Sequence, residues 1–523
     1  MQTYPLQNTG VSRLIQDFLN ESPDLKNFYT QKVSRESLMQ QAKVKTKSYK
    51  NRAVLTQVLS AQNQILTAKQ QKNLKALENP NAVTVTTGHQ LNLATGPLYF
   101  IYKILHTVKM CEEMNRSQEQ FTFVPIFWMA TEDHDFEEIN HFSTYQSTYR
   151  WQRESGGFVG EMGTDGVLAV FTEFFKGLEK NQAAKNLEKM ITKAYQKKDL
   201  AASTRFLVQE LLGEWGVLIL DANHPELKRL AIPYFEKELR NQLAQEAVQA
   251  TNHQLSKYKE QAFAREINLF YSENGKRERI DFEDGVYFLV DSLKKFEGDE
   301  IFKALENSPE KFSPNVILRP LYQEIILPNV CYIGGGGEIS YWLQLKRMFA
   351  QFEIEFPLIM LRNSFLILTR NQCEKATKFG ILPQHLFSSI SELKSEWVKQ
   401  QTDLFEVLEN LKESIEQKFF KASEIAEKTD DTFRQMLLAQ QQKQLNGYEK
   451  MKKRLQKAEE KRLRSKIRRL ENLYEIMFPS GTWQERKINF SVFYQKYGEN
   501  FFEAVYESLD AFESNFVVKC FDY

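Results

Sequence analysis

The sequence predicts an α/β protein with a doubly wound parallel sheet, helical insertions and a long antiparallel coiled-coil arm. Two patterns lead to this prediction. Up to about residue 385, short β-branched or apolar runs alternate with stretches of helical periodicity, which is typical of parallel α/β sheets. Beyond Ser388, apolar residues recur every three to four positions, and no proline occurs between Pro383 and Pro479. That pattern favours two long paired helices.

The alternation begins after a helical N-terminal segment. Residues 1–80 are rich in Gln, Lys, Leu and Ala and lack β-branched runs, which favours helices. The β-branched run 82–86 and the apolar run 121–129 are predicted strands, and a helix is expected between them over 98–114. A right-handed crossover makes the two strands parallel.

Further elements continue the same pattern. Apolar runs predict strands at 217–221, 287–290 and 331–333, and helical stretches are expected over 171–212 and 226–263. We interpret these strands as additional members of the doubly wound sheet, with the helical stretches as crossovers and insertions.

The arm is predicted to consist of two helices. Apolar residues at helical spacing occupy 397–415 and 445–477, and Thr429-Asp430-Asp431 supplies a turn and an N-cap between them. The second helix is strongly basic over 450–469. We interpret this as a solvated face that pairs with acidic residues of the first helix, and nucleic-acid binding is the alternative. The acidic residues are Glu406, Glu409, Glu413 and Glu416.

These patterns divide the chain into three parts. Residues 1–385 form the α/β core with its inserted segments, and residues 386–477 form the coiled-coil arm. The last part, 478–523, is rich in aromatic residues and is expected to return to the core.

The composition excludes several classes of protein. Lys and Arg number 69 against 68 Asp and Glu, so there is no overall charge bias toward nucleic acid or anionic lipid. The four cysteines are far apart without a CxxC pair, which argues against a disulfide framework and a Cys-rich zinc site. No signal peptide is visible, and no apolar run approaches the ~20 residues that span a bilayer. We therefore expect a cytoplasmic protein without a membrane partner.

The first candidate site follows the predicted strand 82–86. Its loop contains Gly88, His89, Gln90, Asn92, Thr95 and Gly96, and Lys103 lies on the next helix. Ligands in open α/β sheets bind beyond the carboxyl ends of strands, where helix N-termini and glycine backbone favour anions. His89 could contact a phosphate or transfer a proton. An ordinary turn with a capping histidine is the alternative.

The second candidate site follows the strand 121–129. Glu132, Asp133, His134 and Asp135 are consecutive, and three adjacent carboxylates repel one another unless a cation balances them. A substrate amine, Mg²⁺ or a general-base role would each explain the cluster. The spacing matches no standard metal motif, so no metal ligands are predicted. The alternative is an acidic cap for a helix beginning near Phe136.

The third candidate site surrounds four consecutive glycines. Gly334, Gly335, Gly336 and Gly337 follow a predicted strand, and Glu338 and Tyr341 come directly after them. Glycines allow a ligand close to the backbone, although a flexible turn is the alternative. Arg319, upstream, could bind a carboxylate or phosphate with two hydrogen bonds.

Four segments together resemble a known family. They are TTGHQLNLATGPLYFIYKI (86–104), VPIFWMATEDHDFEEINHF (124–142), FSPNVILRPLYQEIILPNVCYIGGGGEISYW (312–342) and FPSGTWQER (478–486). Their wording and order are similar to the bacillithiol-biosynthesis cysteine-adding enzymes, in particular the Bacteroidetes branch of that family.

The resemblance implies a function and a fold. The family is thought to join the cysteine carboxyl to the amine of glucosaminyl-malate, the last step of bacillithiol synthesis. It implies a Rossmann-like core similar to class I aminoacyl-tRNA synthetases and nucleotidyltransferases, with inserted connecting segments, and a homodimer formed through the arm. An amide-forming ligase is expected to use ATP with Mg²⁺, and no zinc is expected.

On this hypothesis each candidate residue has a role. The catalytic candidates are His89, Asp133, His134 and Asp135. The substrate-binding candidates are Gln90, Asn92, Glu132, Arg319, Glu338 and Tyr341. The nucleotide-binding candidates are Gly88, Thr95, Gly96, Lys103, Gly334, Gly335, Gly336 and Gly337. Two other functions stay open: a class I synthetase-like or nucleotidyltransferase enzyme acting on another acceptor, and a non-catalytic coiled-coil assembly protein.

Overall fold

A computed structural model describes residues 2–154, 156–381, 387 and 389–521 in two compact units. The first unit comprises the chain up to residue 366 together with 484–519, and the second comprises 367–483 with the end of the chain from 520. The expected boundary between residues 385 and 386 falls within 382–386 and lies outside the described residues.

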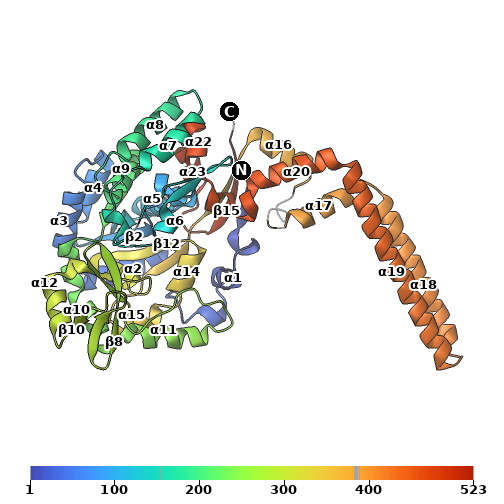
Figure 1. Cartoon of the computed structure of the whole chain (residues 1–523), viewed down its shortest axis with the longest axis horizontal. Helices are drawn as coiled ribbons and strands as arrows, with labels where there is room; N and C mark the ends of the chain where they lie inside the picture. Colours follow the sequence, from blue (N-terminus) through green and yellow to red (C-terminus); the bar gives the residue numbers. More distant parts are fainter. Residues whose placement is uncertain (1, 155, 382–386, 388, 522–523) are drawn as a thin grey trace. The chain divides into compact units, whose positions relative to one another are not determined.

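A five-stranded parallel sheet forms the centre of the first unit (Figure 1). Its strand order is β13-β12-β2-β3-β6, and every neighbouring pair is parallel. The chain therefore starts in the middle at β2, builds outward to β6, and then returns to build the other side. This order confirms the predicted α/β class and places the reversal between β2 and β12, where ligands bind in such sheets. The strands are β2 (Ala82–His89), β3 (Thr122–Met129), β6 (Leu218–Asp221), β12 (Asn329–Gly334) and β13 (Leu358–Leu361).

Strand β2 is longer than the sequence predicts. It pairs with β3 over its whole length, including Gly88 with Trp128 and His89 with Met129. Thr87, Gly88 and His89 therefore belong to the strand end rather than to a loop. The helix α5 (Tyr99–Ser117) then crosses from β2 to β3 and packs on both.

Helices surround this sheet. Before it the chain forms α1 (Arg13–Leu19), α2 (Arg35–Ser48), α3 (Arg52–Gln62) and α4 (Ala68–Ala76). Between β3 and β6 it forms α6 (Phe136–Ile139), the hairpin β4 (His141–Ser143) and β5 (Thr148–Arg150), and helices α7 (Val167–Lys176), α8 (Gln182–Ala194) and α9 (Leu200–Leu212). The predicted helical stretch 171–212 is thus three shorter helices.

A separate antiparallel sheet is inserted between β6 and β12. It has the order β10-β9-β8-β7-β11 and contains the predicted strand 287–290 as β9, so the assignment of that strand to the parallel sheet was wrong. Two hairpin turns explain the difference. Asn274-Gly275 and Asp284-Gly285 all have positive φ, as a tight turn between antiparallel strands requires. The strands are β7 (Leu269–Glu273), β8 (Lys276–Glu283), β9 (Val286–Leu289), β10 (Lys295–Phe296) and β11 (Phe312–Pro314).

Helices flank this inserted sheet, and the end of the chain returns to the first unit. The inserted helices are α10 (Pro225–Asn241), α11 (Leu243–Gln254), α12 (Glu300–Asn307) and α13 (Arg319–Ile326), and α14 (Gly336–Trp342) and α15 (Lys346–Gln351) join β12 to β13. The returning elements are α21 (Gln484–Lys487), α22 (Ser491–Tyr497), α23 (Asn500–Ser508) and β15 (Asn515–Phe521), which pairs antiparallel with β1 (Gln2–Pro5).

The second unit is helical, and β14 (Ser364–Thr369) leads the chain into it. Its long helices α18 and α19 lie side by side and form the arm (Figure 1). The Asp430 carboxylate accepts a hydrogen bond from Phe433 N at 2.8 Å, so the predicted N-cap is present. Lys452 pairs with Glu409 across the two helices, as the charge pattern predicted. The helices are α16 (Arg370–Lys378), α17 (Ile390–Lys399), α18 (Leu404–Ala426), α19 (Asp431–Arg462) and α20 (Arg464–Met477).

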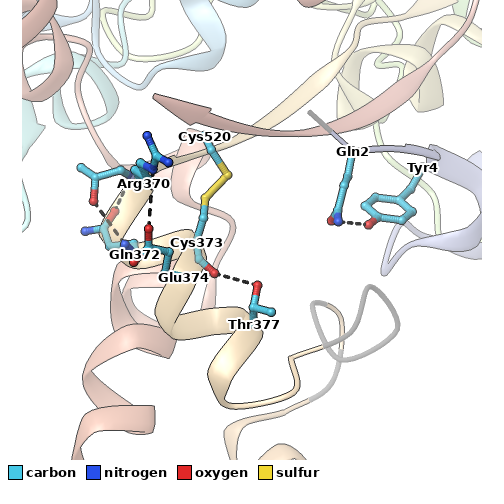
Figure 2. The surroundings of a disulfide bond; sticks show 9 residues. Gln2, Tyr4, Arg370, Gln372, Cys373, Glu374, Thr377 and Cys520 are labelled. Atoms are coloured by element: carbon cyan, nitrogen blue, oxygen red, sulfur yellow. Dashed lines mark hydrogen bonds and ion pairs between the residues drawn. A yellow bond between two sulfur atoms is a disulfide. The ribbon is translucent and has the colours of Figure 1, made fainter. Parts of the chain in front are cut away.

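A disulfide joins Cys373 on α16 to Cys520 at the end of β15 (Figure 2). The sequence argued against disulfides, and for this pair that expectation was wrong. The two cysteines are 147 residues apart, so no local spacing signals their pairing. Only the return of the chain after the arm brings Cys520 to α16. Cys111 and Cys331 are buried free thiols. Among the described helices, none is long and apolar enough to cross a membrane.

Candidate active site

A cavity of about 560 Å³ lies at the carboxyl ends of β2, β3 and β12, where the strand order reverses. Each of these strands sends its following loop or helix into the cavity wall, and the inserted antiparallel sheet contributes Phe270 and Arg277. The cavity brings together ten of the residues predicted from the sequence. They are Gly88, His89, Gln90, Lys103, Asp133, His134, Asp135, Arg319, Glu338 and Tyr341.

The remaining predicted residues do not line this cavity. Glu132 is buried and forms an ion pair with Lys228, which also donates to Phe312 O at 2.8 Å. Thr95 and Gly96 lie in a tight turn with φ of 67° and 68°, and Asn92 packs beneath that turn. The structure thus gives Glu132 a contact that joins β3 to the inserted segment. Of the four glycines, Gly334 and Gly335 lie against the Glu338 side chain.

His89 ends β2 with its ring packed against Tyr99 and Phe100. Its Nε2 is buried and has no hydrogen-bond partner among the described residues. Burial, together with the positive charges of Lys103 and Arg362, lowers the pKa of His89 well below its ordinary value. His89 is therefore a neutral imidazole, and a ligand in the cavity can supply the missing partner of Nε2.

Asp133 is a paired carboxylate. Its Oδ2 lies 3.6 Å from Arg319 Nη1 and accepts from Gln90 Nε2 at 3.2 Å, while Oδ1 accepts from His134 N at 3.0 Å. Burial raises the pKa of Asp133, but Arg319, Gln90 and Arg277 outweigh it, so the pKa lies below its ordinary value. Asp133 is therefore suited to hold a cation rather than to accept a proton.

His134 is held by Arg277, a residue that no sequence motif indicated. Arg277 Nη1 donates to His134 Nδ1 at 2.7 Å, and its Nε and Nη2 donate to Ser313 Oγ and Pro314 O. Burial and the charge of Arg277 lower the pKa of His134. Because Nδ1 accepts this bond, the proton of the neutral ring is on Nε2. Arg277 comes from β8, far away in sequence, so only the fold reveals the contact.

Asp135 caps a helix and also lines the cavity. Its Oδ1 accepts from Glu138 N at 3.4 Å, which caps the short helix α6. The same side chain is exposed and lines the cavity. Unlike Asp133, it forms no ion pair with another described residue of the chain, so it remains accessible to a ligand.

Lys103 is buried on α5, and its ammonium is balanced by Glu338. Lys103 Nζ lies 2.8 Å from both Glu338 oxygens and also donates to Gly88 O. Burial lowers the pKa of Lys103, while Glu338 opposes that effect. Glu338 also accepts from Tyr332 Oη at 2.5 Å and from Gly335 N at 2.8 Å. This network ties β2, α5, β12 and α14 together at the cavity floor.

The four glycines have no unusual backbone angles. None of them has positive φ, and a Cβ on Gly337 would meet nothing within 4 Å. The protein itself therefore does not require glycine at 337. Gly335 N instead donates to the Glu338 carboxylate at 2.8 Å, at the start of α14.

The cavity offers partial complementarity to a nucleotide. His89 Nε2, the buried atom without a partner, fits a phosphate oxygen if it carries the ring proton. Lys103 and Arg319 add positive charge, but each already faces a carboxylate. Among the described residues, no three His, Cys, Asp or Glu side chains gather as metal ligands. Any Mg²⁺ would be held chiefly by nucleotide phosphates.

Nearly the whole chain matches models of one protein family. Residues 1–363 match the model described as "Bacillithiol biosynthesis BshC, N-terminal Rossmann-like domain", and residues 365–519 match "Bacillithiol biosynthesis BshC, C-terminal coiled-coil domain". The chain belongs to the BshC family. This confirms the predicted family and the Rossmann-like fold with its coiled-coil domain.

Relatives match over nearly their full length. A Flavobacterium johnsoniae protein is 42% identical over 97% of this chain and 96% of its own. A Cytophaga hutchinsonii protein is 34% identical, covering 98% and 97%, and a Bacillus velezensis protein is 26% identical, covering 96% of each. All three are named "Putative cysteine ligase BshC". Membership of the BshC family confirms the expected enzyme class, a ligase, and the similarity to the Bacteroidetes branch.

Proposed function

We propose that this BshC-family protein is the cysteine ligase of bacillithiol biosynthesis, joining the cysteine carboxyl group to the amine of glucosaminyl-malate. The observation that carries the proposal is the Asp133–Arg319 pair, 3.6 Å apart at the strand ends of a Rossmann-like sheet. An ammonium group of a ligand can bind to Asp133 and a carboxylate can bind to Arg319, because each carries the opposite charge. The names of the relatives support cysteine as one substrate.

Amide formation from a carboxylate and an amine in water requires activation of the carboxylate. When bound, ATP supplies that activation by giving the carboxylate a good leaving group. The residues of this chain would orient the reactants. His89 Nε2 donates to a phosphate oxygen, and the Lys103–Glu338 network holds the end of β2 in place. Arg319 holds a carboxylate.

The attacking amine must also lose a proton. Asp133 is a weak acceptor because its neighbours lower its pKa, and His134 Nδ1 is occupied by Arg277. Asp135 is exposed at the cavity and forms no ion pair with another described residue, so we assign it as the proton acceptor. Asp133 then orients the amine, and His134 donates a hydrogen bond to the substrate from Nε2.

The test supplies the purified protein with cysteine, glucosaminyl-malate and ATP, and detects bacillithiol by mass spectrometry. The coproduct, AMP or ADP, identifies the activated species. Asp133→Asn removes the charge that holds the amine and should lower kcat/KM by at least about 100-fold. Asp281→Asn is the matched control, because Asp281 lies on β8 outside the cavity and pairs with Arg279. Unchanged turnover in Asp133→Asn would contradict the assignment.

We propose further that the arm joins two copies of the chain. Nine of the fourteen large apolar side chains that are exposed in the described part of the chain lie between Leu404 and Met451. Leu404, Val407 and Leu411 follow helical spacing along α18 and remain 45–59% exposed although α19 packs beside them. A second arm would cover this stripe.

A further inference from the structure

A second cavity, of about 550 Å³, adjoins the candidate active site. The two cavities share Gln90, Tyr99 and Glu138 in their walls. Gln90 and Glu138 form a hydrogen-bonded partition between the two cavities. Gln90 Nε2 donates to Glu138 Oε2 at 2.7 Å on one side and to Asp133 Oδ2 at 3.2 Å on the other. A ligand in the second cavity therefore lies one side chain away from the proposed amine site.

The second cavity has a positively charged wall. Arg150, Arg486 and Lys487 line it together with the carboxylate of Glu138, which accepts from Gln90, and Arg150 also pairs with Glu137 at 3.3 Å. His141 also lines it, and burial together with the charge of Arg150 lowers the pKa of His141, so this ring is neutral near pH 7. With Glu137 counted, three positive charges stand against two negative ones, so a net positive charge remains at this wall. Such a wall favours an anion.

A buried anchor fixes the two cations of the returning segment. Arg486 and Lys487 belong to α21, and their neighbour Glu485 is fully buried. Glu485 accepts from both terminal nitrogens of Arg362 at 2.8 and 3.0 Å, and from Phe365 N at 3.0 Å. The anchored helix holds Arg486 and Lys487 at the cavity wall, so their position is set by buried contacts of the fold.

Asn92 supplies a second, independent indication of a ligand. It lines the second cavity and is only 8% exposed. Its Nδ2 donates to Glu138 O at 3.1 Å, but its buried Oδ1 accepts no hydrogen bond from the described residues. An unpaired buried acceptor is costly, and a hydroxyl donor would satisfy it. The cavity therefore suits a ligand with anionic oxygens and hydroxyl groups.

We infer that the second cavity binds the carboxylate-bearing part of the hydroxyl-rich acceptor, so that its amine reaches Asp133 across the Gln90–Glu138 partition. Arg486 and Lys487 contact the carboxylates and determine the specificity for an acidic glycoside. This inference rests on the proposed function, because it takes the acceptor to be an amino sugar linked to a dicarboxylate. A nucleotide also combines anionic oxygens with hydroxyls, and the experiment separates the two sources.

The test measures binding to the full-length protein by calorimetry, with three ligands in turn: glucosaminyl-malate, methyl glucosaminide without carboxylates, and ATP. In Arg486→Gln and Lys487→Gln, the Kd for glucosaminyl-malate should rise about tenfold or more, since each loses a charge-assisted hydrogen bond. The Kd values for the other two ligands should not change. Lys487→Arg should restore most of the affinity. Arg229→Gln is the control, an exposed arginine on α10 outside both cavities.

Each outcome is decisive. Unchanged glucosaminyl-malate binding in both Gln variants overturns the inference, as does a loss confined to ATP, which would make the cavity a nucleotide site. Unchanged ATP binding in the variants shows that they are folded. Failure of the proposed function has a different signature: wild-type protein then forms no bacillithiol, whether or not the variants lose affinity for the glycoside. Selective loss of glycoside binding with normal wild-type turnover supports both.

Discussion

Asp133 and Asp135 are two residues apart, yet their neighbours give them different chemistry. Arg319 and Gln90 hold Asp133 as an anion, whereas Asp135 caps a helix and is exposed at the cavity. The sequence identified the carboxylate cluster but could not divide the roles. The partners come from the residue that follows β2, from β8 and from α13, and contacts between distant elements leave no trace in local sequence.

Arg277 provides the sharpest prediction for a single residue. Its charge and the burial of the ring lower the pKa of His134, so Arg277→Gln should raise that pKa. If catalysis requires His134 to be neutral, the acidic limb of the pH–rate profile of Arg277→Gln should move to higher pH by about half a unit or more. Labelled histidine NMR, assigned with His134→Gln, measures the same pKa directly.

The control for this prediction lies on the same strand. Arg279→Gln removes an arginine of β8 that pairs with Asp281 and does not line the cavity. This variant should leave the pKa of His134 unchanged. Equal pKa values for His134 in wild type and Arg277→Gln would show that the contact does not control the ring.

His106 leads to a prediction about stability and pH. It is fully buried on α5, where Nδ1 accepts from Asn363 N at 3.3 Å, and burial lowers its pKa to about 4. Between the unfolded value of about 6.5 and the folded value, the unfolded chain binds the extra proton. The contribution of His106 is therefore complete above pH 6.5 and is lost as the pH falls toward 4.

Hydrogen exchange of the α5 amides measures this effect. Going from pH 7.5 to 4.5, the free energy of opening should fall by about 2 to 3 kcal/mol more in wild type than in His106→Gln. The comparison cancels the carboxylates that titrate in both proteins. Parallel pH dependences in the two would mean that His106 is charged or accessible in the folded state.

At the scale of elements, the sequence predicted four of the five parallel strands, missing β13, and predicted the insertions poorly. The strands at 82–86 and 121–129 are β-branched or apolar throughout, as strands buried on both faces must be. The inserted sheet was missed although Asn274-Gly275 and Asp284-Gly285 are strong hairpin signals. These dipeptides were visible in the sequence. The Cys373–Cys520 bond was not visible in the sequence, because it depends on how the chain returns after the arm.

The disulfide predicts a measurable property of the second unit. Joining residues 147 apart restricts the unfolded chain, so Cys373→Ser should lower the free energy of unfolding of this unit by about 3 to 5 kcal/mol. Thiol titration of denatured, unreduced wild type should find two free cysteines, Cys111 and Cys331, and four after reduction. Four free thiols without reductant would contradict the bond. Cys111→Ser is a control that leaves the pair intact.

At the scale of the whole molecule, one topological feature accounts for the position of the site. The strand order reverses between β2 and β12, and the crevice at that point collects the loops that carry the candidate residues. The sequence predicted these loops because each follows a strand directly. It could not predict the second cavity, because α21 joins that wall only after the chain has passed through the arm.

The proposed self-association is tested at the same scale. Val407→Glu with Leu411→Lys replaces two exposed apolar residues of α18 without changing the net charge. Sedimentation velocity should then show a monomer and should show a dimer for the wild-type protein, since burial of this stripe would stabilise the proposed pair. The control, Asn410→Glu with Gln417→Lys, adds the same charges at exposed polar positions of the same helix and should remain dimeric. A wild-type monomer at micromolar concentration would rule out the arm as a dimer interface, and the exposed stripe would then need another occupant.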